Sequence, residues 1–243
     1  MHKCRVLVIT GAGISAESGI PTFRGAGGLW RTFNAAALAT PEAFQNDPET
    51  VWTWYRERRA GVRTAVPNAA HNAIVKLASH AREFLLLTQN VDDLHSRARW
   101  NGSSVTPDQL VQIHGDLFVT RCSRCTCSRR DENGDGTGVP ACPCCGAPMR
   151  PGVVWFGEGL DPHSVARAER FVGDARADAV LVVGTTAAFP YIIDWTRRAA
   201  GSSGRIFEIN PDETQLSRLA TTVIREPAAI AVPRIVDDLI ANG

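Results

Sequence analysis

The chain has 243 residues, 44% of them hydrophobic and 21% charged, so it can bury a core and is not intrinsically disordered. Its 26 Lys and Arg residues balance 25 Asp and Glu residues, and the net charge of +1 argues against a protein that mainly binds nucleic acid or an anionic membrane. No apolar run reaches the roughly 20 residues of a membrane-spanning helix, and we expect a soluble, cytoplasmic protein.

Short apolar runs alternate with helical stretches along the chain. Strands are predicted over Val6–Thr10, Phe84–Thr88, Leu110–Ile113, Ala179–Val183, Arg205–Ile209 and Thr222–Ile224. Helices are predicted over Pro48–Arg63, Asn68–Ala81, Pro162–Ala177, Tyr191–Ala200 and Val232–Ala241, with Pro233 in the first turn of the last. Most of the strands are apolar throughout, which indicates an α/β fold with a doubly wound parallel sheet that is covered on both faces.

Two segments interrupt this alternation. Residues 26–76 contain no predicted strand, and residues 117–152 are rich in Cys, Gly and Pro. We expect the first to be a helical insertion and the second a zinc-binding module, and together they would form a smaller lobe. Residues 1–25, 77–116 and 153–243 would then form a Rossmann-like domain.

A glycine-rich motif follows the first predicted strand. Gly11, Gly13 and Ala16 fit the dinucleotide fingerprint, in which the backbone approaches a diphosphate at the start of a helix. A tight turn between a strand and a helix would use the same glycines. No Asp or Glu stands about 20 residues past the strand to bind a ribose, and Trp30 and Arg31 are there instead. The pattern indicates dinucleotide binding without the usual layout of a hydride-transfer enzyme.

Polar residues also follow four other predicted strands at their carboxyl ends. They are Gln89-Asn90-Val91-Asp92, His114-Gly115-Asp116, Gly184-Thr185-Thr186 and Asn210. In an open α/β sheet the carboxyl ends of the strands lie along one edge, and ligands bind there. The sequence therefore predicts one binding site along this edge.

Six of the seven cysteines lie within residues 122–145. Cys122 and Cys125 form one C-x2-C pair and Cys142 and Cys145 another, 16 residues apart, which is the spacing of a zinc ribbon. Four thiolates fill the coordination shell, so we expect one structural zinc ion. A redox-active cluster is the alternative, and a part for Cys127 or Cys144 in metal binding stays open.

Taken in order, these motifs resemble the sirtuin family over almost the whole chain. The resemblance rests on Gly11-Ala12-Gly13-Ile14-Ser15, Gly19-Ile20-Pro21-Thr22-Phe23-Arg24, Thr88-Gln89-Asn90-Val91-Asp92, His114-Gly115, the four cysteines, Val153-Val154-Trp155-Phe156-Gly157-Glu158, Gly184-Thr185-Thr186 and Glu208-Ile209-Asn210. It implies a Rossmann-like domain with a helical and zinc-binding lobe. It also implies removal of acyl groups from lysine with NAD as co-substrate, which yields nicotinamide and O-acyl-ADP-ribose.

The resemblance implies roles for particular residues. His114 would be the base that activates a ribose hydroxyl, and Asn90 and Asp92 would hold the nicotinamide carboxamide, although Asp92 also fits a helix N-cap. The other expected NAD contacts are Gly11, Ala12, Gly13, Ser15, Phe23, Arg24, Gln89, Gly184, Thr185, Thr186, Asn210 and Ala228. Phe23 and Arg24 also fit core packing and a surface salt bridge, respectively.

Two positions depart from the family pattern. Thr186 stands where the family commonly has Ser, and it keeps the hydroxyl. The segment Glu226-Pro227-Ala228-Ala229 stands where the family often has a Gly-Lys-Ala-Gly-like loop, so Ala228 is assigned to the adenine from its position alone.

Tyr55 and Arg58 are three residues apart and would share one helix face. A guanidinium and a phenol suit a carboxylate, and the pair resembles the acyl-pocket motif of class III sirtuins, which remove succinyl, malonyl and glutaryl groups. Ala35 falls where that class has a small residue. A surface arginine beside a packed tyrosine is the alternative interpretation.

Val154, Gly157 and Glu158 lie where the resemblance places the substrate peptide, which would add as an extended strand. The expected partners are proteins or peptides that carry acyl-lysine, and the chain is expected to be a monomer. A plain lysine deacetylase or a protein ADP-ribosyltransferase would use the same NAD site. A zinc-ribbon nucleic-acid binder is a third alternative, motivated by Arg121, Arg124, Arg129 and Arg130.

Overall fold

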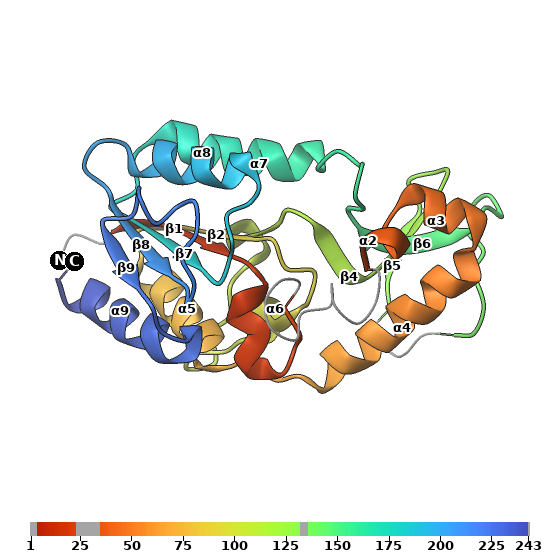
Figure 1. The fold of residues 1–243 in the computed structure, drawn as a ribbon, viewed down its shortest axis with the longest axis horizontal. Helices are drawn as coiled ribbons and strands as arrows, with labels where there is room; N and C mark the ends of the chain where they lie inside the picture. Colours follow the sequence, from red (N-terminus) through yellow and green to blue (C-terminus); the bar gives the residue numbers. More distant parts are fainter. Residues whose placement is uncertain (1–3, 23–34, 132–135, 243) are drawn as a thin grey trace.

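The computed structural model describes residues 4–22, 35–131 and 136–242, which form a large and a small lobe (Figure 1). A parallel sheet of six strands forms the centre of the large lobe. Its strands are β1 (Arg5–Thr10), β2 (Glu83–Thr88), β3 (Leu110–Gln112), β7 (Ala179–Val183), β8 (Arg205–Ile209) and β9 (Thr222–Ile224). The six predicted strands are therefore confirmed, each to within one residue at either end.

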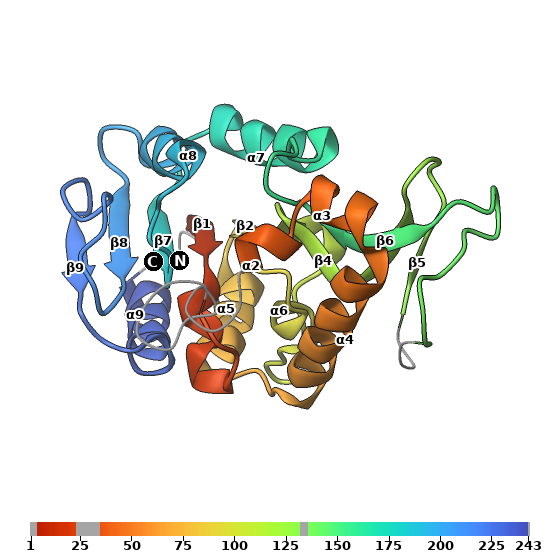
Figure 2. The same ribbon diagram turned by 45° about the vertical axis from the view of Figure 1, so that its right-hand side comes forward.

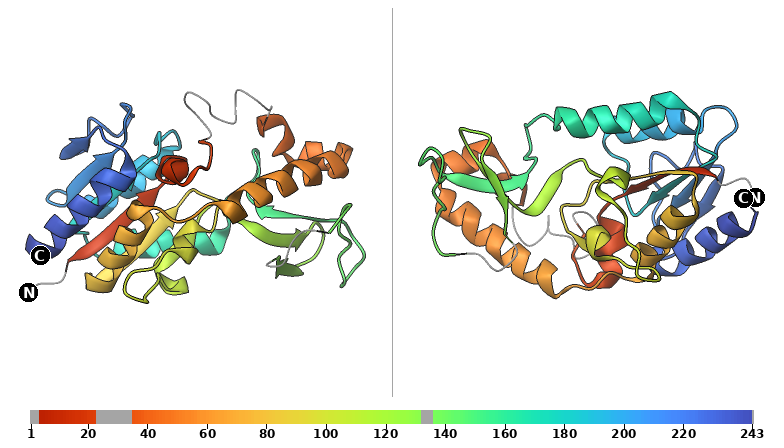
Figure 3. Two further views of the ribbon diagram at one scale, coloured as in Figure 1. Left: turned by 90° about the horizontal axis from the view of Figure 1, so that it is seen from below. Right: turned by 180° about the vertical axis from the view of Figure 1, so that it is seen from behind.

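The strands lie in the order β3-β2-β1-β7-β8-β9, which is the order of a Rossmann fold. The order reverses between β1 and β7, and ligands bind beyond the carboxyl ends of the strands at such a point. β1 starts at the end of the large lobe that is remote from the small lobe and runs toward the small lobe (Figures 1 and 3). The carboxyl edge of the sheet therefore faces the second lobe.

Two layers of helices cover the sheet (Figure 2). On one face α5 (Ala69–His80) packs against α9 (Ala228–Asn242), and on the other α7 (Pro162–Asp174) packs against α8 (Pro190–Ala200). Val6 and Val8 of β1 lie in the core with α5 and α9, whereas Leu7 and Ile9 lie in the core with α7 and α8. Burial on both faces explains why the strands are apolar throughout.

The start of α9 corrects one prediction. The helix begins at Ala228, and Pro233 lies inside it instead of in its first turn. Proline is common at the first helical position, which is why the sequence favoured a later start. Ala228 and Ala231 are buried in the core with α5, and this packing extends the helix on the N-terminal side of the proline.

Within the described part of the chain, the small lobe combines three helices with a three-stranded antiparallel sheet. Its elements are α2 (Ala35–Leu38), α3 (Pro41–Asn46), α4 (Pro48–Thr64), β4 (Gly115–Cys122), β5 (Ser128–Arg130) and β6 (Met149–Val153). Thr40 and Asp47 accept hydrogen bonds from N–H groups in the first turns of α3 and α4, so each side chain caps its helix. Helix α5 packs on the large sheet, although residues 69–76 were assigned to the insertion. The division into domains otherwise remains a proposal.

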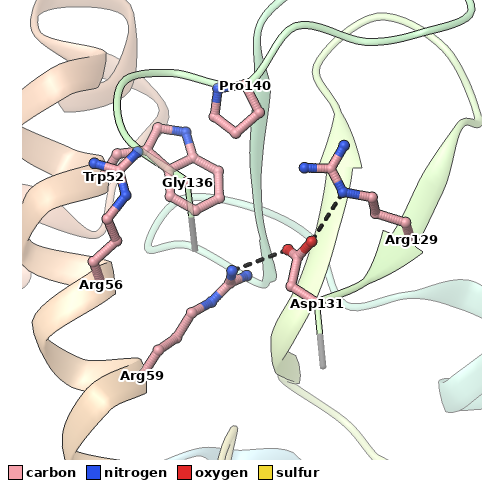
Figure 4. A pocket seen from close by; sticks show the side chains of 7 residues that line it. All are labelled: Trp52, Arg56, Arg59, Arg129, Asp131, Gly136 and Pro140. Carbon is pink, nitrogen blue, oxygen red and sulfur yellow. Dashed lines mark hydrogen bonds and ion pairs between the residues drawn. The ribbon is translucent and has the colours of Figure 1, made fainter. Parts of the chain in front are cut away.

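Arg59 joins α4 to the small sheet. Its side chain is fully buried and donates hydrogen bonds to the carbonyl oxygens of Leu117 at 2.7 Å and Val119 at 3.1 Å. It also contacts Asp131 at 3.0 Å, and Arg129 contacts the same carboxylate at 2.9 Å (Figure 4). The pocket drawn there is thus bridged by ion pairs that hold the lobe together. The sequence analysis missed this role of Arg59.

Among the helices of the described residues, none combines the length and the apolarity that crossing a membrane requires.

Candidate active site

The loops after β1 and β7 meet at the point where the strand order reverses. The N–H of Gly11 donates to Val183 O at 3.0 Å, and the N–H of Gly13 donates to Gly184 O at 2.8 Å. A Cβ atom on Gly13 would lie 2.7 Å from the Cα of Gly184, so this position requires glycine. The 3₁₀ helix η1 (Ala12–Ser18) follows and ends at Gly19, where φ is +84°. The glycines therefore form a tight turn, and the helix that follows it is short.

A buried polar cluster adjoins this loop. The Ser15 hydroxyl donates to Oδ2 of Asp92 at 3.0 Å, and the Asn90 amide donates to the Ser15 hydroxyl at 3.2 Å. The other Asp92 oxygen accepts from the N–H of Leu94, the first residue of α6 (Leu94–Arg97), at 3.1 Å. Burial raises the pKa of Asp92. Asp93 is the N-cap residue of α6, so Asp92 precedes the cap. One oxygen of Asp92 accepts from the first helical N–H, and the other oxygen belongs to the cluster.

A second set of polar contacts joins the ends of β2, β7 and β8. The Gln89 amide donates to the Thr185 hydroxyl at 2.9 Å, and the Asn210 amide donates to the Thr185 carbonyl at 2.9 Å. Thr186 follows and is exposed. The structure thus brings the predicted strand-end residues together on one edge. Amides, hydroxyls and close-packed glycines around a reversal of strand order fit a dinucleotide.

His114 has a defined tautomer. Its Nδ1 lies 2.9 Å from the Gln89 carbonyl oxygen, which can only accept, so Nδ1 carries the proton of the neutral ring. The lone pair is then on Nε2, which lies 2.7 Å from the hydroxyl of Tyr191. Burial lowers the pKa of His114, and the hydrogen bond to Gln89 opposes this effect. Burial thus favours the neutral ring, in which Nε2 is the atom that can accept a proton.

Tyr191 is a site residue that the sequence analysis missed. It is the second residue of α8, and its ring stacks on Phe189 with a centroid distance of 5.4 Å and an interplanar angle of 14°. The sequence indicated only a helix here, because a tyrosine at a helix start carries no signal of a site. Packing alone brings its hydroxyl to His114.

Tyr55 and Arg58 share one face of α4, as predicted. Tyr55 is buried, and its hydroxyl accepts a hydrogen bond from Nε1 of Trp155 at 2.9 Å. The Arg58 guanidinium lies over the ring of Trp54 at 4.8 Å and that of Tyr55 at 5.7 Å. Burial lowers the pKa of Arg58, while the charges of Tyr55 and Asp92 raise it. Arg58 therefore lies within electrostatic reach of the predicted nicotinamide pocket.

Three of the predicted contacts are not described. Phe23 and Arg24 lie outside the described residues, and so does the side chain of Ala35 at the start of α2. Ala228 is described as the first residue of α9, with its side chain in the core, and the N–H of Ala229 donates to Glu17 at 3.0 Å. The adenine contact of Ala228 stays a prediction.

The segment from Val154 to Glu158 runs beside His114. The N–H of Val154 donates to the His114 carbonyl at 2.9 Å, and the N–H of Trp155 donates to Glu158 at 2.8 Å. Glu158 is also paired with Arg150 at 2.9 Å, and Gly157 has φ +85°, which favours glycine. Peptide docking at Val154, Gly157 and Glu158 stays a prediction. The N–H groups of Val154 and Trp155 are already used within the protein.

Four cysteine sulfur atoms gather between β4 and β6. The Sγ atoms of Cys122 and Cys145 lie 3.5 Å apart, and Sγ of Cys125 lies 3.6 Å from those of Cys142 and Cys145. A zinc ion with Zn–S bonds of about 2.3 Å in a tetrahedron separates its sulfur ligands by about 3.8 Å. The four side chains therefore fit a closed structural zinc site.

Cys142 also belongs to a second group with Cys127 and Cys144, whose ligand atoms all lie within 4.8 Å of one another. Cys127 and Cys144 thus lie next to the predicted zinc site without completing its tetrahedron. The distances among Cys122, Cys125, Cys142 and Cys145 favour those four as the ligands.

The fold and the site define an α/β protein with a dinucleotide site at the reversal of its strand order and a separate four-cysteine metal site. The model of the Sir2 family matches residues 11–189. The chain therefore belongs to the Sir2 family, the sirtuins.

Individual relatives are similar over nearly the whole chain. "NAD-dependent protein deacylase 1" of Archaeoglobus fulgidus is 43% identical over 238 residues, which cover 98% of this chain and 92% of that protein. The "NAD-dependent protein deacylase" of Thermus thermophilus is 47% identical over 229 residues, covering 92% and 86%.

Solved structures of Sir2 proteins are also similar to this chain. A Sir2 homologue mutant bound to ADP-ribose has a TM-score of 0.85 at 41% identity and covers 98% of this chain and 91% of its own. A Sir2 homologue bound to NAD has a TM-score of 0.82 at 41% identity, covering 98% and 88%. Both similarities extend across the two lobes.

Proposed function

We propose that this sirtuin is an NAD-dependent protein-lysine deacylase that prefers acidic acyl groups. The observation that carries the proposal is the position of His114, whose Nδ1 is held by the Gln89 carbonyl and whose Nε2 lone pair lies beside the strand-end polar cluster. The relatives named NAD-dependent protein deacylase support the activity. The products would be the free lysine, nicotinamide and O-acyl-ADP-ribose.

The strand-end residues would bind NAD. Bound NAD supplies an ADP-ribosyl group that accepts the acyl oxygen as nicotinamide leaves. Asn90 and Asp92 would hold the carboxamide of nicotinamide, because both are buried and already joined through Ser15. Gln89, Thr185 and Asn210 would orient the rest of the dinucleotide, and the close-packed glycines bring the backbone to it.

His114 would take a proton from a ribose hydroxyl through Nε2. A neutral imidazole is required, and burial keeps His114 neutral by lowering its pKa. The Gln89 carbonyl holds Nδ1–H, so the ring cannot turn its proton toward the substrate. Zinc would have no part in this chemistry, since four thiolates leave no ligand position open.

Tyr55 and Arg58 carry the proposed preference for acidic acyl groups. A guanidinium provides charge and directed N–H donors for a carboxylate. The Arg58 guanidinium lies over the ring of Tyr55, whose hydroxyl accepts a hydrogen bond from Trp155. The half-buried setting strengthens a charge pair, whereas an acetyl group offers Arg58 no counter-charge. Succinyl and malonyl groups are therefore the proposed substrates, with glutaryl as a third of the same kind.

Mass spectrometry of one peptide carrying either acetyl-lysine or succinyl-lysine, with and without NAD, tests both parts of the proposal. We expect NAD-dependent loss of succinyl to be faster than loss of acetyl. Tyr55→Phe combined with Arg58→Met should reduce desuccinylation much more than deacetylation. Equal losses would refute the carboxylate pocket and leave a plain deacetylase.

The partner is proposed to be a protein or peptide with an acylated lysine. A solved Sir2 structure with a p53 peptide and NAD, 27% identical with a TM-score of 0.80, supports binding of a peptide substrate. We also propose that the chain is a cytoplasmic monomer without a nucleic-acid partner, in keeping with its net charge of +1. Light scattering tests the monomer, and DNA retention without NAD turnover would favour the nucleic-acid alternative.

A further inference from the structure

The base atom of His114 already has a hydrogen-bond partner within the protein. A neutral imidazole has one lone pair, and the contact of Nδ1 with the Gln89 carbonyl places that lone pair on Nε2. The Tyr191 hydroxyl lies 2.7 Å from Nε2 and is the donor of this hydrogen bond. The proton-accepting position of the site is thus taken up by a side chain of the same protein.

Aromatic packing holds Tyr191 in this position. Its ring is nearly parallel to that of Phe189, and its centroid lies 5.1 Å from that of Trp195 one turn further along α8. Phe189 also contacts the edge of the His114 ring, with a centroid distance of 5.4 Å. The side chain is half-buried, so its hydroxyl has room to exchange one partner for another.

We propose that Tyr191 caps the base atom of His114 in the ligand-free enzyme, and that a ribose hydroxyl of NAD displaces the Tyr191 hydroxyl from Nε2 on binding. This inference rests on the proposed function, because it needs NAD to reach His114. Two hydroxyl donors compete for one lone pair, so the cap opposes binding of NAD. It also keeps the buried base hydrogen-bonded while no substrate is present.

Tyr191→Phe removes the competing hydroxyl and keeps the stacked ring. A hydrogen bond of this kind changes an equilibrium by about two- to tenfold, so the KM for NAD should fall by that factor. The kcat should stay unchanged, because the cap is absent from the NAD-bound enzyme. Trp195→Phe is the matched control: it keeps an aromatic ring beside Tyr191 and leaves the Tyr191 hydroxyl and His114 in place, so the KM for NAD should stay unchanged.

The chain has only two tyrosines, which makes the displacement directly visible. In zinc-loaded enzyme with ring-labelled tyrosine, carbon NMR should give two Cζ resonances, and Tyr191→Phe assigns them. NAD should shift the Tyr191 resonance. His114→Ala should shift it to a similar position without NAD, and the Tyr55 resonance should not respond to that variant.

The outcomes separate this inference from the proposed function. Calorimetric binding of NAD with an unmoved Tyr191 resonance would overturn the cap, even if the enzyme deacylates. A lower kcat with unchanged KM in Tyr191→Phe would also overturn it, because the tyrosine would then act in the bound state. A shifted resonance without any deacylation would support the cap and refute the proposed reaction, and absence of NAD binding would refute both.

Discussion

Nδ1 of His114 lies 2.9 Å from the carbonyl oxygen of Gln89, a residue 25 positions earlier in the chain. This single contact determines which nitrogen of the imidazole can accept a proton. Because β2 and β3 are neighbours, the end of one strand supplies the carbonyl and the end of the other supplies the ring. A main-chain group thus sets the tautomer of the proposed base.

His114→Ala should reduce kcat by about 10²- to 10⁴-fold, the usual contribution of a general base. Calorimetry should still detect NAD binding, since the other strand-end contacts remain. In the wild type, the acidic limb of kcat/KM should have its midpoint below pH 6.5, because burial lowers the pKa of His114. Substantial deacylation by the variant would exclude His114 as the base.

The buried pair of His71 and His95 should make the fold sensitive to acid. Burial and the charge of Arg97 lower the pKa of His71 from 6.5 to about 4, and the pKa of His95 lies well below its usual value. Because the folded-state pKa is depressed, the stability is present above pH 6.5 and is lost as the pH falls toward 4. For His71 alone the free energy of unfolding should fall by about 3 kcal/mol over this window.

Urea unfolding at several pH values measures this loss. His71→Gln should reduce the pH dependence of the free energy of unfolding between pH 6.5 and 4. His80→Gln, at an exposed histidine, should leave this pH dependence unchanged. The same pH dependence in His71→Gln and the wild type would contradict the view that protonation of His71 destabilises the fold.

Cys142→Ser should release the zinc ion and loosen the small lobe, because Cys142 is buried among the sulfur ligands. Cys144→Ser should retain one zinc per chain, since its side chain is exposed and lies outside the tetrahedral set. Elemental analysis of the two purified variants measures the number of zinc ions per chain, and urea unfolding measures their stability. Full zinc content and unchanged stability in Cys142→Ser would refute a structural zinc site.

Arg59→Leu should lower the free energy of unfolding of the zinc-loaded protein by about 3–5 kcal/mol, the usual cost of breaking a buried ion pair. The change leaves Asp131 and two β4 carbonyl groups without this donor. Arg129→Leu is the matched control, because Arg129 contacts the same carboxylate from a half-exposed position and should contribute less than about 1 kcal/mol. Similar losses of unfolding free energy in the two variants would show that burial does not strengthen the contribution of Arg59 to stability.

The sequence predicted the features that depend on short stretches of chain. The short apolar runs predicted the six strands to within one residue. Burial on both faces requires apolar side chains in the central strands β1, β2 and β7, whereas β9 at the sheet edge is largely exposed. The spacing of the four cysteines predicted the metal site, since each pair needs only one turn to bring two thiols together. The helix start at Ala228 was missed, because burial against α5 outweighs the usual position of proline.

Contacts between distant segments were decided by the tertiary structure alone. Gly13 meets Gly184 because β1 and β7 are neighbours in the sheet. Tyr191, near the start of α8, reaches His114, which lies two residues past the end of β3. Arg59 is buried because β4 offers it carbonyl groups. Patterns along a chain record which face of an element is buried, but the partner on that face depends on how the elements pack. The sequence by itself therefore determined the family, the strands and the four-cysteine cluster, and packing determined the environment of the proposed base.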